Sequence, residues 1–348
     1  MKNFSVLFTI LLTFFIFSET ARADFSDYGK QVPDGPWFNT PMDVVVDSAG
    51  NFYVSNVSIT RIQKYDSNGN LLLNWGTNGV SNGQFRSPNG LAIDSQDNIY
   101  VIEGTAGNRV QKFSSTGEFL TKWGSNGSAL GQFASAVGIA IDSDDNVYVS
   151  DTANHRIQKF DSTGRFITSW GGLGAGNGQF NDPQEIAIDD NDFIYVVDRD
   201  NKRVQKFDSN GNYQLQWGTA GTGDGQFTTP HGIIVAGGKV FVGDGSANNI
   251  QCFTTEGVFE YKVGSYGWQD NQFYSVKGLG SDSTGHVYAV DLNNGRIQKL
   301  SNDGTFISRF GGKGSQDGVF ASPAGAAIDS DGSIFVSDYQ KHNIQKFS

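Results

Sequence analysis

Three side chains with useful chemistry, Glu185, His231 and Lys277, follow one another at intervals of 46 residues, close to the mean repeat length of the chain. A carboxylate, an imidazole and an ammonium group that meet in space can bind a polar ligand or exchange protons with it. They meet only if the fold brings the chain back to the same place at each interval. The same interval recurs along the whole sequence, which indicates an internal repeat.

Each repeat unit is anchored on a phenylalanine, and the anchors are Phe38, Phe85, Phe133, Phe180, Phe227, Phe273 and Phe320. Every unit contains four short apolar runs bounded by Gly, Asn and Asp. In the third unit these runs are Val137–Asp142, Val147–Asp151, Arg156–Phe160 and a last run ending at Gly171. Four such strands in about 47 residues are typical of a propeller blade. We therefore predict an all-β fold, a β-propeller of seven four-stranded blades.

The two ends of the chain predict export and ring closure. Residues 1–23 have the pattern of a signal peptide, with Lys2, an apolar run and the cleavage motif Ala21-Arg22-Ala23. The propeller would then span 24–348, secreted or periplasmic. The last unit ends after its third strand, and Asp24–Gly29 matches a fourth strand. We expect this N-terminal strand to complete the final blade, because pairing there removes exposed sheet edges.

The segment NHRIQKF, Asn154–Phe160, with the preceding VYVSDTA, resembles the NHL repeat. Similar propellers occur in TRIM-NHL and Brat-type proteins, in peptidyl-hydroxyglycine amidating lyase and in bacterial sensor kinases. Many of these have six blades, which is the alternative to seven. The RING, B-box and coiled coil of TRIM proteins have no counterpart here. The lyase holds zinc with histidines that converge in the channel, whereas only His231 of the four histidines falls at the channel mouth.

Residues that recur in every unit are best explained as scaffold. We expect the strand-c glutamines to satisfy backbone groups between blades, the acid that ends strand b to bond loop amides, and the strand-d tryptophans to pack between blades. Examples are Gln158, Asp151 and Trp123. The Asp-rich turns at Asp142 and Asp329 resemble part of a calcium loop but lack its downstream Glu, so a structural calcium is a minor alternative and no other cofactor is expected.

Residues at the start of strand a do not repeat, although their backbone positions are equivalent. This set is the predicted ligand site at the channel mouth: Asp43, Asn89, Gln184, Glu185, His231 and Lys277. A histidine with its ordinary pKa would make binding sensitive to pH between about 5 and 8. A solvated channel entrance is the alternative interpretation. Tyr266 and Trp268, in the joint before the sixth unit, are predicted to add aromatic contacts to a sugar or peptide.

Composition excludes some partners and leaves two functions open. The formal charge of −11 disfavours nucleic acid, since phosphate binding needs clustered Lys and Arg. No later segment is expected to span a membrane, and we expect a monomer. The single cysteine, Cys252, is interpreted as inert. A binding scaffold for a protein, peptide or glycan is the favoured function. The alternative is a propeller enzyme of lyase or lactone-hydrolase type, using His231 with Glu185.

Overall fold

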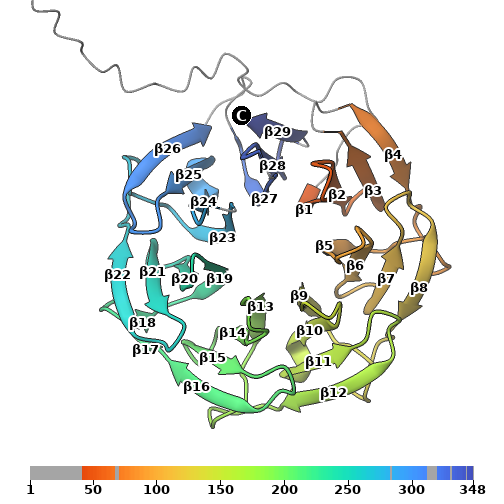
Figure 1. Ribbon diagram of the computed structural model, residues 1–348, viewed down its shortest axis with the longest axis horizontal. Coiled ribbons are helices and arrows are strands. Elements are labelled where there is room, and N and C mark those ends of the chain that lie inside the picture. The colour runs from red at the N-terminus through yellow and green to blue at the C-terminus, as the bar shows by residue number, and fades with distance from the viewer. Residues whose placement is uncertain are drawn as a thin grey trace, which may run out of the picture.

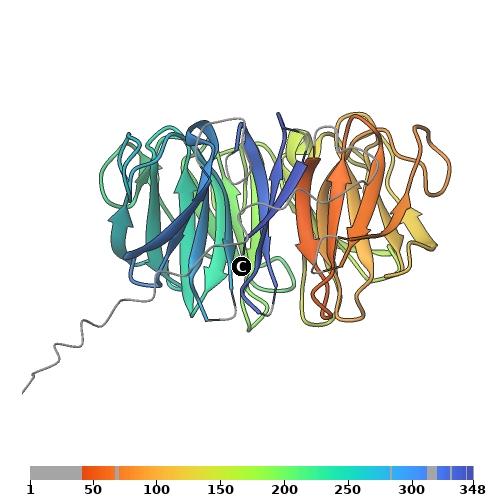
Figure 2. The same cartoon turned by 90° about the horizontal axis from the view of Figure 1, so that it is seen from above.

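A computed structural model describes residues 41–66, 70–282, 284–311, 320–329, 331–341 and 343–347. Seven small antiparallel sheets stand in a ring around a central channel, as Figure 1 shows face-on. Seen from the side the molecule is a flat disc, with strands running between its two faces (Figure 2). The prediction of a seven-bladed, all-β propeller is confirmed, and the six-bladed alternative is wrong.

The blades follow the chain in order, each beginning with its innermost strand. The first three blades comprise β1 (Pro41–Val46), β2 (Phe52–Asn56), β3 (Arg61–Tyr65) and β4 (Leu71–Trp75); β5 (Pro88–Ile93), β6 (Ile99–Glu103), β7 (Arg109–Phe113) and β8 (Phe119–Trp123); and β9 (Ala136–Ile141), β10 (Val147–Asp151), β11 (Arg156–Phe160) and β12 (Phe166–Gly171). Within each blade neighbouring strands pair antiparallel, so every connection is a hairpin.

The remaining blades repeat this order. They comprise β13 (Pro183–Ile188), β14 (Ile194–Asp198), β15 (Arg203–Phe207) and β16 (Tyr213–Trp217); β19 (Pro230–Ala236), β20 (Lys239–Asp244), β21 (Asn249–Thr254) and β22 (Phe259–Val263); β23 (Val276–Ser281), β24 (Val287–Asp291), β25 (Arg296–Leu300) and β26 (Phe306–Gly311); and β27 (Pro323–Ile328), β28 (Ile334–Asp338) and β29 (Asn343–Phe347). The strand expected to complete the last blade, Asp24–Gly29, lies outside the described residues.

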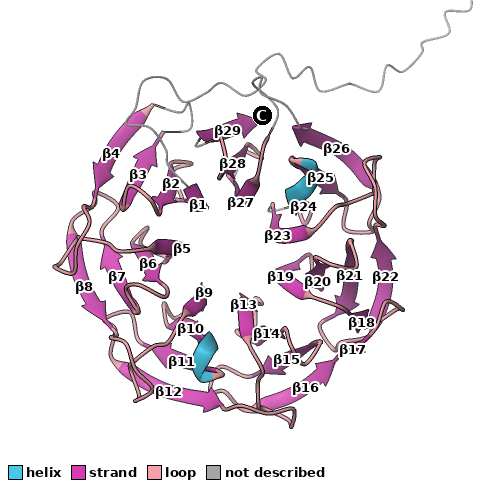
Figure 3. Ribbon diagram, turned by 180° about the vertical axis from the view of Figure 1, so that it is seen from behind, coloured by secondary structure: helices cyan, strands magenta, loops and turns pink. Residues whose placement is uncertain are grey.

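Short elements decorate the connections. The parallel pair β17 (Thr219–Ala220) and β18 (Gln226–Phe227) lies in the joint between the fourth and fifth blades. Two 3-10 turns, η1 (Thr152–Asn154) and η2 (Leu292–Asn294), follow the second strands of the third and sixth blades, and are the cyan segments of Figure 3. They are the only helical elements in the described part of the chain.

Apolar packing between blades supplies the core. The second and third strands of most blades are buried along their length, whereas the outermost strand alternates exposed and half-buried residues. Trp123, at the end of β8, packs edge-on against Tyr100 with centroids 6.1 Å apart and against Phe160 of the next blade at 5.6 Å. The predicted role of the tryptophans between blades is therefore confirmed.

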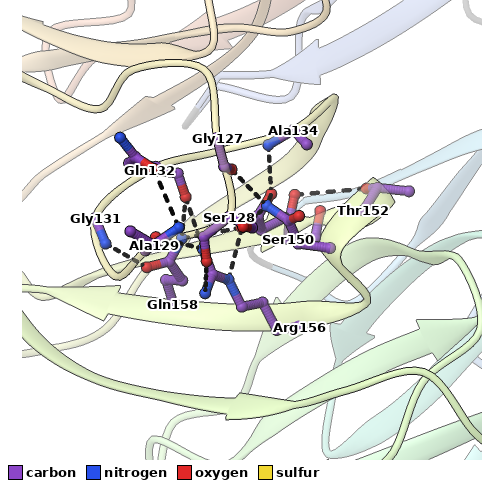
Figure 4. A network of polar contacts seen from close by, with 12 residues as sticks. Gly127, Ser128, Ala129, Gly131, Gln132, Ala134, Ser150, Thr152, Arg156 and Gln158 are labelled. Carbon is purple, nitrogen blue, oxygen red and sulfur yellow. Dashed lines mark hydrogen bonds and ion pairs between the residues drawn. The ribbon is translucent and has the colours of Figure 1, made fainter.

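A buried polar network stabilises the described joints between blades, and Figure 4 shows the one between the second and third blades. Asp151 accepts the backbone N–H of Ala134 at 2.7 Å and pairs with Arg156 at 2.7 Å. The Gln158 side chain donates to the carbonyl of Gln132 and accepts the N–H of Gly131. These contacts confirm that the repeated Asp and Gln satisfy backbone groups of the preceding joint, so their recurrence needs no functional explanation.

A second buried cluster, the Asp–Tyr–Lys triad, links each early blade to the next. In the third blade the Tyr148 hydroxyl donates to Asp142 at 2.8 Å. Lys159 pairs with the same carboxylate at 3.3 Å and donates to the carbonyl of Ser209 in the fourth blade. Backbone amides and Asn146 take up the remaining acceptor capacity of Asp142. This turn, considered as part of a calcium loop, therefore has its carboxylate engaged by protein donors.

The fifth blade replaces all three members of the triad together. Ala236, Phe241 and Cys252 stand where the third blade has Asp142, Tyr148 and Lys159, and all three are buried. The Tyr261 hydroxyl donates to the carbonyl of Asn302 at 2.7 Å, so it takes over the link to the next blade that a lysine provides elsewhere. Simultaneous replacement is physically reasonable because removing one partner alone would leave a buried charge unpaired.

Candidate functional site at the channel mouth

A cavity of about 290 Å³ occupies the channel at the ends of the innermost strands. Its lining is drawn from all seven blades, and five predicted residues are part of it: Asp43, Asn89, Glu185, His231 and Lys277. The rest of the wall is mainly apolar or glycine, including Met42, Val137, Ile233, Leu279 and Ala324. The structure therefore brings most of the predicted set to one place of ligand size.

Local backbone geometry explains why these positions face the channel. The pairing of the first and second strands shifts register at the start of each blade, between Pro183 and Ile186 in the fourth and between Pro230 and Ile233 in the fifth. The intervening residues, which include Glu185 and His231, form a bulge. A bulge frees its residues from the ladder and redirects their side chains, and bulges often lie beside functional sites.

Most blades need glycine at the second bulge position because the next blade is close. A Cβ on Gly138 would stand 2.6 Å from the carbonyl oxygen of Gln184, and one on Gly232 would stand 2.9 Å from that of Lys277. Asp43 and Glu185 occupy this position in the first and fourth blades. These two blades therefore carry a side chain at a position where most of the other blades have room only for glycine.

Asp43 is held by protein contacts. Its carboxylate accepts the N–H of Val44 at 2.9 Å and that of Leu91, in the second blade, at 2.8 Å. Burial raises the pKa of Asp43 to about 6, and these two amide bonds limit the rise. Asp43 thus links two blades at the cavity wall, and it adds negative charge there once ionised.

Glu185 has no hydrogen bond or ion pair with any residue in the described ranges. Its pKa is raised to about 7, mainly by burial and to a smaller extent by the charge of Asp43, while the charge of Lys277 opposes the rise. A carboxyl group with this pKa is close to half-ionised at neutral pH, and it has both its oxygens available to a ligand. Groups perturbed in this way by burial inside a cavity are candidates for function.

His231 and Lys277 come from the two following blades. Burial, together with the charges of Lys277 and Arg199, lowers the pKa of His231 to about 4, although a hydrogen bond to the backbone of Lys277 opposes this. His231 Nδ1 is buried without a partner among the described residues. Lys277 likewise forms no ion pair within the described chain. Burial thus places the pKa of His231 below the range of pH 5 to 8 predicted for it, whereas the pKa values of Glu185 and Asp43, about 7 and about 6, lie inside that range.

Two of the remaining predicted residues are positioned by neighbours. Asn89 lines the cavity, and its side-chain oxygen accepts the hydroxyl of Ser87 at 3.0 Å. Gln184 is buried, does not line the cavity and interacts with Asp182. Asp182 also pairs with Arg199, which follows the end of β14. Sequence reasoning missed Arg199, although a charged residue at this loop position occurs in the fourth unit alone among the described units.

The aromatic pair lies apart from the cavity, on the joint between β22 and β23. Tyr266, Trp268 and Tyr274 are 55%, 65% and 40% exposed, so the three rings form a surface cluster. Tyr266 contacts Trp268 and Tyr274 edge-on, with centroid distances of 5.8 and 5.1 Å. Tyr274 was not predicted, because the residue after the anchor Phe varies in type from unit to unit.

The three described histidines do not converge. The ring of His155 accepts the N–H of Asp182, and His286 bonds Asp282 and Thr284 in a hairpin turn. His342 lies outside the described residues. In the described ranges no group of three His, Cys, Asp or Glu side chains is arranged to hold a metal ion. Nor does any helix there have the length and apolar character needed to cross a bilayer.

Together, the ring of blades and the cavity at its centre define a β-propeller with a ligand-sized site in its channel. The sequence model of the NHL repeat matches residues 85–113, 133–160, 180–207 and 320–347, the inner three strands of four blades. The protein is therefore an NHL-repeat β-propeller. No curated protein matches the sequence itself.

Solved propellers share the fold at low identity. A streptogramin B lyase is 16% identical, with 92% of this chain and 97% of that chain covered at a TM-score of 0.74. A catalytically inactive virginiamycin B lyase from Staphylococcus aureus, with quinupristin, is 14% identical, with 92% and 98% covered at 0.70. Kuenenia stuttgartiensis hydrazine synthase is 12% identical, with 90% and 97% covered at 0.68.

Proposed function

We propose that the protein is an extracytoplasmic binding scaffold whose channel cavity receives a polar part of a protein, peptide or glycan. The observation that carries the proposal is that Glu185 and Lys277 both line one cavity and that neither side chain has a partner among the residues that the structure describes. Ionisable groups in such a place reduce stability, because burial opposes their charged forms. A scaffold that needs glycine at this position in most blades has no structural reason to place a glutamate there.

The size of the cavity limits what can enter it. A volume of about 290 Å³ is at the lower end of ligand pockets, so it admits a small molecule, one sugar unit or one residue of a longer chain. A macromolecular partner would contact the loops around the mouth and insert a single group. The surface cluster Tyr266, Trp268 and Tyr274 would give a second, separate contact for a glycan or peptide.

The test compares a triple variant of the cavity with a double variant at exposed positions in the secreted protein. The cavity variant combines Glu185→Ala, His231→Ala and Lys277→Ala. It should no longer bind the glycans or peptides that the parent protein binds on arrays. A matched variant at exposed positions, Glu118→Ala with Arg165→Ala, should retain the parental pattern. If the cavity variant, still folded by circular dichroism, keeps every array signal of the parent, the proposal is wrong.

A lyase is the second candidate, and the pKa of Glu185 favours it. A carboxyl group with a pKa of about 7 is suited to general-base catalysis at neutral pH. His231, neutral because its pKa is about 4, could donate or accept a hydrogen bond beside it. Quinupristin, present in the structure of one relative, is the first substrate to try. Time-dependent product detected by mass spectrometry, lost in Glu185→Gln, would support the enzyme, and unchanged quinupristin would count against it for this substrate class.

A further inference from the structure

The charges around the cavity have a definite order. Glu185 belongs to the fourth blade and Lys277 to the sixth, and the fifth blade, with neutral His231, lies between them. Glu185 and Lys277 influence each other electrostatically but form no ion pair with each other. A negative and a positive side chain thus face the same space from two sides of one blade, each without a partner among the described residues.

This order discriminates between classes of ligand. A simple anion would pair with Lys277 but would meet the carboxylates of Glu185 and Asp43 in the same cavity. A simple cation would pair with Glu185 but would meet Lys277. A molecule that carries both charges can satisfy both side chains at once, and in a partly desolvated cavity each such charge-assisted contact is strong. The uncharged part of the wall, with Met42, Val137 and Leu279, is apolar.

We propose that the cavity binds a small zwitterion of the α-amino-acid type, with its carboxylate on Lys277, its ammonium group on Glu185 and an apolar side chain against the apolar wall. The proposal rests on the cavity being a binding site, as proposed above, and it names the ligand class. A free amino acid fits a cavity of about 290 Å³, which a large peptide does not.

The first experiment separates the two charges of the ligand. L-leucine, 4-methylpentanoate and 3-methylbutylamine share one apolar chain and carry both charges, only the negative one or only the positive one. Calorimetric titration of the secreted protein should give binding of L-leucine at least about tenfold tighter than either single-charge probe, the factor expected for one charge-assisted contact. A thermal-shift screen of all twenty standard amino acids checks for a preferred side chain.

Variants reverse the preference in a predictable direction. Lys277→Met should weaken L-leucine by about tenfold or more and should bind 3-methylbutylamine more tightly than the parent does. Glu185→Gln should weaken L-leucine similarly and should favour 4-methylpentanoate. Glu118→Gln, at an exposed position, should match the parent for all three probes.

The pH dependence of ligand affinity provides an independent readout. Asp43, His231 and Lys277 face Glu185, and the ammonium group of the ligand binds the ionised form of Glu185. With a pKa of about 7, Glu185 is about 10% ionised at pH 6 and about 90% at pH 8, so affinity should rise about tenfold between them. His231, with a pKa of about 4, stays neutral throughout, and Asp43, at about 6, adds a smaller effect at the acid end. Glu185→Gln should remove most of this dependence.

Two results would overturn the proposal in different ways. If 4-methylpentanoate binds as tightly as L-leucine, or no amino acid binds while the arrays still identify a cavity-dependent ligand, the zwitterion is wrong and the binding function stands. If the cavity variant also keeps every array signal, the binding function itself fails.

Discussion

Replacing Glu185 with glutamine should stabilise the protein at alkaline pH while it weakens ligand binding. In the folded protein Glu185 holds its proton up to a pH of about 7, whereas in the unfolded chain it releases it near 4.5. Between these values the folded state binds more protons, so the free energy of unfolding decreases as pH rises. Above pH 7 the free energy of unfolding has decreased by the full amount that this carboxyl group contributes. Glutamine has nearly the same shape and no charge, so it avoids this loss.

The magnitude follows from the difference between the two pKa values. Each unit corresponds to about 1.4 kcal/mol, so ionised Glu185 lowers the free energy of unfolding by about 3 kcal/mol at pH 8. For a chain of this length that corresponds to roughly 4 °C in Tm. At pH 4 the carboxyl group is mainly protonated in both states, and the parent and Glu185→Gln should melt together.

Thermal melts followed by circular dichroism at pH 4, 6 and 8 would measure this. The difference in Tm between Glu185→Gln and the parent should be near zero at pH 4 and should increase through pH 6 to its full value at pH 8. Glu118→Gln, at an exposed site, should show no such trend. A gain in Tm that is absent at pH 8, or equal at all three pH values, would refute the assignment of Glu185 as a half-buried carboxylate without a partner in the described part of the chain.

Other regions give further tests. Lys159→Met leaves Asp142 buried without its cation and should cost about 2 kcal/mol in urea denaturation, while an unchanged midpoint would contradict the triad. Cys252→Lys places an ammonium group in a buried position where no triad acid stands, and it should lower Tm. An unchanged Tm would contradict this expectation. Trp268→Ala should leave Tm unchanged but weaken glycan or peptide capture if its exposed ring binds them. Deletion of 24–30 should lower Tm if that segment closes the ring. N-terminal sequencing of the exported protein should begin at residue 24.

The fold was predictable because each blade solves the same packing problem with the same residues. The recurring tryptophans, Gln158 with its equivalents and the strand-b acid all have the roles inferred from their recurrence. The cavity was predictable for the opposite reason, since Glu185, His231 and Lys277 vary where the backbone does not.

Three-dimensional environment determined what could not be predicted. Asp43 is engaged by the amide of Leu91, and Gln184 is buried beside Asp182, because both depend on how neighbouring strands approach one another. The pKa of His231 falls to about 4 through burial and two nearby cations. The fifth unit departs from the repeat at three positions in the sequence. Only the structure shows that these three positions form one triad.

The cysteine in that altered triad is a natural probe of local opening in the blade beside the cavity. Cys252 is the single thiol of the chain, it is fully buried, and burial raises its pKa to about 12. Such a thiol reacts with a labelling reagent only when its surroundings open. The rate of labelling therefore measures transient opening of the fifth blade, the blade that carries His231. A ligand that bridges the fourth and sixth blades should slow this reaction, and the measurement needs no engineered cysteine.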